Sequence, residues 1–159
     1  MIRRLLSLPE TFASEFHGLE GRGQEGWFAG SDPAGRKVGS GGGTAHLLAE
    51  AFRNSGGSGS FEKWLAGGRH LVIHSGGESR RLPAYAPCGK SLLPLPVFRW
   101  SKGQHLDQKL LDFQSGFYGR ILQSAPATYT TLIASGDVMF ISPDRFGNLP
   151  EADALVFGV

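Results

Sequence analysis

The stretch from residue 70 to residue 90 constrains the fold of this chain more than any other. A short apolar run, Leu71 to Ile73, leads almost directly into the glycine pair Gly76 and Gly77. A buried strand that opens into a glycine-rich turn lets backbone N–H groups approach an anion closely. Three basic residues follow the glycines: Arg80, Arg81 and Lys90. Because fixed positive charge is what a phosphate group requires, the pattern predicts a phosphate-binding loop at the end of a strand.

The rest of the chain alternates between helical and strand patterns. Apolar spacing and capping residues predict helices over residues 7–19, 44–54, 61–66 and 107–123, the last with Leu106, Leu110, Phe113, Phe117 and Ile121 on its apolar face. Short apolar runs predict strands over residues 69–74, 130–134, 138–141 and 154–157. Residues 21–43 are polar and rich in glycine, which predicts a loop. Such alternation implies an α/β fold of three layers, a mostly parallel sheet flanked by helices, in one domain over residues 1–159.

Composition limits the classes of function. With 40% hydrophobic and 19% charged residues, the 159-residue chain is globular and long enough for a core. A formal charge of +2 gives no argument for a nucleic-acid partner. No apolar run approaches the roughly 20 residues that span a bilayer, so no membrane association is expected. The lone cysteine, Cys88, excludes an internal disulfide, and we expect a cytoplasmic protein.

The loop resembles a known signature. Sugar-1-phosphate nucleotidyltransferases carry the pattern G-G-x-G-T-R-L, then a proline and, further on, a lysine. The matching residues here are Gly76, Gly77, Arg81, Leu82, Pro83 and Lys90. Ser79 replaces the third glycine, Arg80 replaces the threonine, and the interval to the lysine is slightly short. These departures make the stretch more similar to the L-fucose-1-phosphate guanylyltransferases, including the bifunctional fucokinase/guanylyltransferases. Residues 31–44, 94–100 and 134–138 also resemble that family.

The resemblance implies a Rossmann-like nucleotidyltransferase fold and an activity. The expected reaction transfers GMP from GTP to L-fucose-1-phosphate and releases pyrophosphate. Arg81 and Lys90 are the candidates for contact with the triphosphate, assisted by Ser79 and Arg80, with Gly76 and Gly77 shaping the loop. The choice of guanine and fucose comes from the resemblance alone.

A second glycine cluster, from Gly39 to Gly43, runs into the helix predicted from Thr44. A helix N-terminus behind a glycine loop is an anion site in principle, and composition alone is equally typical of a flexible surface loop. The resemblance includes this segment and therefore implies nucleotide contact at Gly41, Gly42 and Gly43. No lysine follows these glycines, as it does in the phosphate loops of many kinases.

Asp137 follows a predicted strand through the sequence Ser-Gly-Asp. Carboxyl ends of strands are where α/β sheets bind ligands, but an aspartate there is also an ordinary turn residue. The resemblance implies a ligand of Mg²⁺, which proteins commonly hold with one or two carboxylates and the substrate phosphates.

For two further residues, the sequence favours a local structural role over a role in catalysis or binding. His74 lies at the end of the strand before the loop, where a local hydrogen bond is favoured over a catalytic role. Asp32, in Ser-Asp-Pro-Ala-Gly, is typical of a turn.

Two other functions stay open. One is a sugar kinase, because the family is often fused to a fucokinase; the other is a non-catalytic nucleotide-binding or interaction domain. The guanylyltransferase region of the family is several times longer than this chain. We therefore expect residues 1–159 to be an N-terminal, nucleotide-side portion of an incomplete fold, with the sugar pocket on later segments and with self-association through exposed sheet surface.

Overall fold

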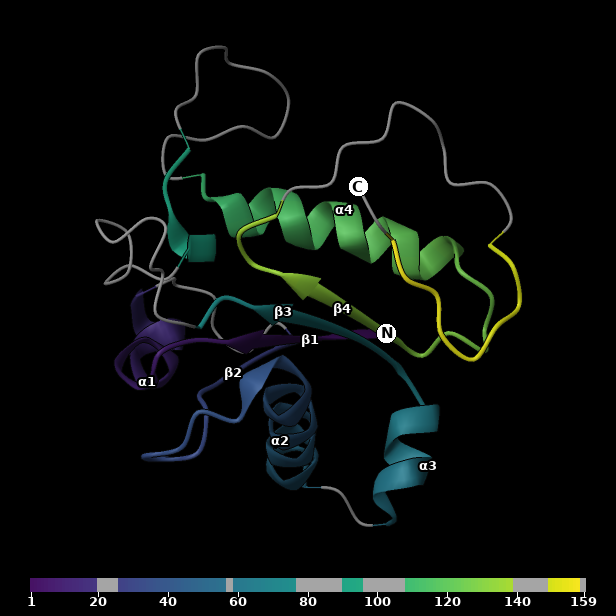
Figure 1. Ribbon diagram of the computed structural model, residues 1–159, viewed down its shortest axis with the longest axis horizontal. Helices are drawn as coiled ribbons and strands as arrows, with labels where there is room; N and C mark the ends of the chain where they lie inside the picture. The colour runs from purple at the N-terminus through teal and green to yellow at the C-terminus, as the bar shows by residue number, and fades with distance from the viewer. Residues whose placement is uncertain (20–25, 57–58, 77–89, 96–107, 139–148, 158–159) are drawn as a thin grey trace.

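Four parallel strands form a single sheet at the centre of the molecule (Figure 1). The computed structural model describes residues 1–19, 26–56, 59–76, 90–95, 108–138 and 149–157. The strands are β1 (Ile2–Ser7), β2 (Trp27–Gly30), β3 (Arg69–His74) and β4 (Thr131–Ser135). They lie in the order β2-β1-β3-β4. The predicted α/β class with a parallel sheet is confirmed.

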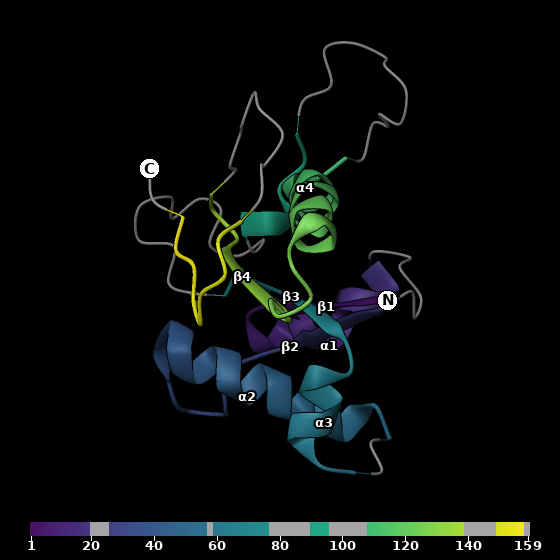
Figure 2. The same cartoon turned by 90° about the vertical axis from the view of Figure 1, so that its right-hand side faces the viewer.

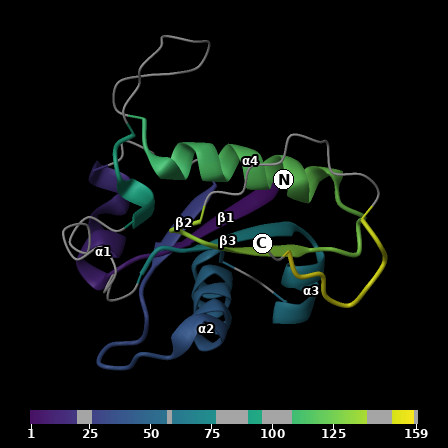
Figure 3. The same cartoon turned by 45° about the horizontal axis from the view of Figure 1, so that its top comes forward.

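Helices cover both faces of the sheet. They are α1 (Glu10–Leu19), α2 (Gly39–Asn54), α3 (Phe61–Ala66) and α4 (Leu110–Ser124), and a 3₁₀ turn, η2, spans Lys90–Leu92. Figure 2 shows α2 and α3 on one side of the strands and α4 on the other, and Figure 3 shows the same layers with the top of the molecule tilted forward. The arrangement has the three layers that the alternating sequence pattern predicted.

Two hydrophobic clusters hold the layers together, one on each face. Successive residues of a strand point to opposite faces, so neighbouring residues of β1 and β3 enter different clusters. The first cluster joins Leu6, Leu71 and Ile73 to Phe16 of α1 and to Leu111, Tyr118, Ile121 and Leu122 of α4. The second joins Leu5 and Val72 to Leu47, Leu48 and Ala51 of α2. Burial on both faces explains why β3 is apolar without alternation.

The strand order places a topological switch point between β1 and β3. From β1 the chain moves to β2 on one side and later continues through β3 to β4 on the other. Just beyond the two strand ends, the backbone N–H of Ser75 donates to the carbonyl of Ser7, at 2.9 Å. Open α/β sheets bind ligands outside the carboxyl ends of their strands at such a point. Ser75 and Gly76, the last described residues before the predicted loop, lie at this point.

Several expected elements differ from the observed ones. The sequence reading missed β1, which contains two arginines, and β2, which has only four residues inside the segment interpreted as a loop. Arg3 fits in β1 because its guanidinium lies over the Trp64 ring, 4.9 Å from the centroid. The strand expected at 154–157 is wrong: these residues form no strand, and Val156 is 88% exposed. Residues 139–141 of another expected strand lie outside the described part of the chain.

Two helices also depart from expectation. Helix α2 begins at Gly39, so the second glycine cluster is helical rather than a loop. Glycine lowers helix propensity, but packing of the apolar stripe of α2 on the sheet outweighs that cost. Helix α4 buries Leu111, Gln114, Tyr118, Ile121 and Leu122. Of the expected face, Ile121 is buried, whereas Phe113 is 38% exposed. The true buried face is therefore rotated by about one residue.

Within the described residues, none of the helices combines the length and the apolar character required to cross a bilayer.

Candidate functional site

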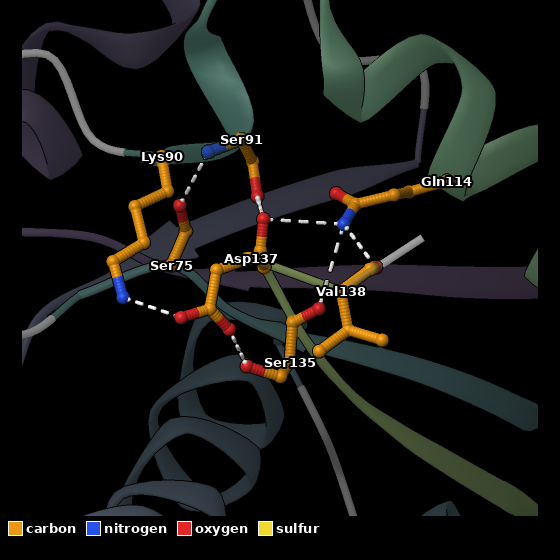
Figure 4. A network of polar contacts seen from close by, with 8 residues as sticks. Ser75, Lys90, Ser91, Gln114, Ser135, Asp137 and Val138 are labelled. Atoms are coloured by element: carbon orange, nitrogen blue, oxygen red, sulfur yellow. Dashed lines mark hydrogen bonds and ion pairs between the residues drawn. The ribbon is translucent and has the colours of Figure 1, made fainter. Parts of the chain in front are cut away.

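An ion pair joins two of the residues that the sequence singled out. Lys90 Nζ lies 2.6 Å from Asp137 Oδ2, although the two residues are 47 positions apart in the chain (Figure 4). Lys90 belongs to η2, and Asp137 follows β4. The side chains are 22% and 35% exposed, so solvent reaches both. Both groups lie at the carboxyl-end edge of the sheet, close to the switch point.

Asp137 is held by the turn that follows β4. The backbone N–H of Gly136 donates to the carbonyl of His74 at 2.7 Å, which ties this turn to the end of β3. The hydroxyl of Ser135 donates to Oδ1 of Asp137. A Cβ at residue 136 would lie 2.8 Å from the His74 carbonyl oxygen and 2.9 Å from Cα of Ser75. Because these neighbours are backbone atoms, only glycine allows the turn to pack this closely.

Lys90 is positioned by its neighbour in η2. The N–H of Ser91 donates to the hydroxyl of Ser75 at 2.8 Å, and the hydroxyl of Ser91 donates to the Gly136 carbonyl at 3.3 Å. Ser91 is fully buried. The serine thus connects the end of β3, the 3₁₀ turn and the turn after β4, and these connections bring Lys90 to Asp137.

Gln114 of α4 also belongs to this network, and the sequence reading missed it. Its side-chain amide donates to the carbonyls of Ser135, Gly136 and Val138, at 3.4, 3.1 and 2.9 Å (Figure 4). The residue is 1% exposed. Choosing the helical face that contains Phe113 placed Gln114 outside the core. The signal available in the sequence was the alternative spacing of Leu111, Gln114, Tyr118 and Leu122, a buried stripe with one amide in it.

The electrostatics of the ion pair favour its charged form. The pKa of Asp137 is lowered, first by the hydrogen bond from Lys90 and then by the one from Ser135, while partial burial opposes the shift. Hydrogen bonds to a carboxylate stabilise its ionised state. Asp137 is therefore an anion at neutral pH, as a metal ligand must be.

A second polar cluster lies beside the first. His74 Nε2 is 2.7 Å from the hydroxyl of Thr44 in α2, and that hydroxyl also donates to the Ser40 carbonyl at 2.8 Å. A Cβ on Gly43 would lie 3.2 Å from Asp32 Oδ1 and 3.5 Å from Cε1 of His74. Burial lowers the pKa of His74, and the negative charge of Asp32 opposes that shift. The local hydrogen bond expected for His74 is observed.

The remaining predicted site residues lie partly inside and partly outside the described part of the chain. Gly76 lies against Ser7 and Leu8, just after the end of β3, and its part in a phosphate-binding loop stays a prediction. Gly41, Gly42 and Gly43 occupy the first turns of α2, whose N-cap residue, Val38, makes no side-chain capping bond. Their contact with a nucleotide stays a prediction. Gly77, Ser79, Arg80 and Arg81 lie outside the described residues.

The only metal site that the described side chains suggest is one with a single protein carboxylate, that of Asp137. Across the part of the chain that the structure describes, no group of three or more His, Cys, Asp or Glu side chains is placed to hold a metal ion by itself. A single ionised carboxylate suits Mg²⁺, which keeps several waters and takes other ligands from substrate phosphates. Asp137 fits that donor set.

The chain is similar to a protein of Bacteroides fragilis named L-fucokinase/L-fucose-1-P guanylyltransferase. The two are 47% identical over 158 residues, which are 99% of this chain and 17% of the relative. The chain therefore spans about a sixth of the length of that relative. No family model matches the chain. No solved structure matches it.

Proposed function

We propose that this chain forms the nucleotide-side portion of an L-fucose-1-phosphate guanylyltransferase, with Lys90 and Asp137 at the triphosphate and Mg²⁺ of GTP. The observation that carries the proposal is the ion pair between these residues at the carboxyl ends of parallel strands. The signature residues and the name of the Bacteroides fragilis relative support the choice of guanine and fucose.

The ion pair suits a ligand that contains charges of both signs. Without ligand, Lys90 and Asp137 neutralise each other. A Mg²⁺–triphosphate offers a cation to the carboxylate and an anion to the ammonium group, so both side chains keep a partner when their own contact opens. Mg²⁺, when bound, supplies electrostatic stabilisation of the phosphate oxygens.

The proposed reaction needs no nucleophile from the protein. A phosphate oxygen of L-fucose-1-phosphate attacks the α-phosphorus of GTP, and the bond from that phosphorus to the bridging oxygen of pyrophosphate breaks. Because the attacking group is already an anion, catalysis depends on position and on charge compensation. Lys90, together with Arg81, offsets charge on the triphosphate and on the leaving pyrophosphate.

Substitution of the two basic residues tests the phosphate contact. Arg81→Ala and Lys90→Ala are each expected to weaken GTP binding by roughly 1–3 kcal/mol, the range for hydrogen bonds to charged groups. Lys63→Ala is the matched control, because Lys63 is exposed on α3, near the amino end of β3. The measurement is calorimetric titration of folded variants. Unchanged GTP affinity in both Arg81→Ala and Lys90→Ala would contradict the proposed contact of these residues with the triphosphate.

A sugar kinase is the second candidate, because the name of the relative also contains L-fucokinase. Product analysis separates the possibilities when the protein is incubated with Mg²⁺, GTP or ATP, and L-fucose or its 1-phosphate. Pyrophosphate and GDP-fucose indicate the transferase, and ADP with fucose-1-phosphate indicates the kinase. Nucleotide binding without either product is the outcome expected of a nucleotide-side portion that lacks its sugar pocket, and also of a non-catalytic binding domain.

We also propose self-association through the sheet. In the described sheet, β4 is an edge strand, and Ile133 on it is 57% exposed. An exposed edge with an apolar side chain favours contact with a second copy. Sedimentation velocity should show concentration-dependent dimers that weaken in Ile133→Thr; a strict monomer at high concentration would contradict this.

A further inference from the structure

We infer that Gln114 is the positioning residue for the Asp137 carboxylate. This inference rests on the proposed Mg²⁺–nucleotide site. In this role Gln114 touches neither the metal nor the nucleotide. Its side-chain amide fixes the backbone turn from which Asp137 projects, and thereby sets where the carboxylate lies.

The contacts bracket Asp137 on both sides. The amide nitrogen of Gln114 donates to the carbonyls of Ser135 and Gly136 before Asp137 and to that of Val138 after it. Three carbonyl oxygens converge on one nitrogen that has two hydrogens, so the donors are shared among them. A turn whose carbonyls point at one donor has little freedom to rotate its peptide groups, and the carboxylate is fixed with it.

Gln114 is poorly explained as packing material. Its Oε1 is buried without a hydrogen-bond partner among the described residues. A buried acceptor without a partner costs stability, and methionine or leucine would fill the same volume without that cost. What glutamine supplies and those residues lack is the donor group that faces the turn.

Neighbouring residues act on the same carbonyls. The hydroxyl of Ser91 donates to the Gly136 carbonyl that Gln114 also contacts, and Ser91 follows Lys90 in the chain. One turn further along α4, the hydroxyl of Tyr118 donates to the Val138 carbonyl at 3.1 Å. The Gly136 carbonyl therefore accepts from two separate side chains, and Ser91 continues to hold Lys90 in place when Gln114 is replaced.

The test compares Gln114→Met with Gln108→Met. Methionine keeps the length and approximate volume of glutamine but has no donor. Gln108 is the matched control, because it is also buried with an unpartnered Oε1 and makes none of the contacts given above to the turn. GTP is titrated by calorimetry with and without Mg²⁺, and the gain in affinity due to Mg²⁺ is the readout. We expect this gain to fall about fivefold or more in Gln114→Met, with GTP affinity in the absence of Mg²⁺ unchanged.

The outcomes are distinguishable from a failure of the proposed function. An unchanged Mg²⁺ gain in Gln114→Met, with loss of the gain in Asp137→Asn, would overturn the inference and leave the site intact. An equal fall in Gln108→Met would also overturn it, since burial rather than the contacts would then explain the effect.

If the wild-type protein shows no Mg²⁺ gain, the proposed function fails, and amide hydrogen exchange in the turn still decides the inference. The N–H groups of Gly136 and Val138 are hydrogen-bonded to the carbonyls of His74 and Ser135, so loosening the turn in Gln114→Met should speed their exchange several-fold. Unchanged exchange at both groups would contradict positioning. Should Gln114→Met not fold, Tyr118→Phe removes only the hydroxyl at Val138 and should give a smaller change in the same direction; no change in that variant would overturn the inference.

Discussion

Strand β3 carries a histidine near each end, and the two side chains lie in opposite environments. His70, near the amino end, is fully buried, with its ring 4.6 Å from that of Trp64. Arg3 on the neighbouring strand donates to His70 Nε2 at 3.1 Å. His74, at the carboxyl end, is half-buried and bonded to Thr44.

The charged neighbours of the two histidines differ in sign. Burial lowers the pKa of both rings. At His70 the Arg3 guanidinium lowers the pKa further, to about 4, with the backbone at Thr130 opposing. At His74 the anionic Asp32 opposes the effect of burial. The amino end of β3 therefore encloses a buried histidine that stays neutral beside a cation, while the carboxyl end of β3 collects accessible charge, as expected where a ligand binds.

The largest expected effect on the free energy of unfolding comes from replacing a glycine at the carboxyl end of β3, compared with one at its amino end. Gly136→Ala should lower the free energy of unfolding by about 3 kcal/mol, because its Cβ would meet backbone atoms of His74 and Ser75. Gly68→Ala, at the amino end, should cost only about 1 kcal/mol, since its Cβ would meet the far end of the Arg3 side chain, which can shift more cheaply than backbone. Urea denaturation measures both changes. Equal costs would show that the two ends are packed with similar tolerance.

The sequence predicts those features of β3 and its ends that depend on residues adjacent in the chain, and it misses those that depend on residues far apart. Strand β3 and the start of its loop could be predicted, because the apolar run and Gly76 are adjacent in the chain. The pairing of Lys90 with Asp137 could not be derived from pattern, since it depends on strand order and on the buried contacts of Ser91. The resemblance selected both residues but gave no distance between them.

Elsewhere the sequence signal was ambiguous. Two apolar stripes with helical spacing run along α4, and choosing the one with Phe113 hid Gln114. The glycine-rich start of α2 has low intrinsic propensity, so its helical form depends on packing against the sheet and was not predictable locally. Strand β2 is too short to show a period.

The pH dependence of stability should separate the two histidines. His70 has a folded pKa of about 4, below the ordinary 6.5, so the unfolded chain binds its proton first as pH falls. Its contribution to stability is thus complete above pH 6.5 and is lost toward pH 4. The loss is on the order of 3 kcal/mol. Urea denaturation from pH 7 to pH 4 should show this loss in the wild type and a much flatter profile in His70→Gln.

His74→Gln is the matched control for that profile. Because Asp32 opposes the shift at His74, removing this histidine should flatten the profile less. A pH profile of stability that flattens more in His74→Gln than in His70→Gln would contradict the claim that His70 is the more strongly shifted histidine.

A smaller effect is expected at the contact between His74 and α2. Thr44→Val removes the hydroxyl that contacts His74 and Ser40 and should lower the free energy of unfolding by about 1 kcal/mol. Thr11→Val, on the exposed side of α1, controls for the change of residue type. Thermal and urea denaturation should agree. Equal stability of the two variants would mean that the hydroxyl adds nothing to the packing of α2.

The most direct measurement is GTP titration of Asp137→Asn with and without Mg²⁺. Asparagine keeps the size of the side chain and removes its charge, so it loses the metal ligand and also frees Lys90 for the phosphates. We predict that Mg²⁺ strengthens GTP binding by the wild type, that this gain disappears in Asp137→Asn, and that binding without Mg²⁺ is equal or tighter in the variant. The same Mg²⁺ gain in both proteins would show that Asp137 is a turn residue and that the carboxyl end of this sheet is not a metal–nucleotide site.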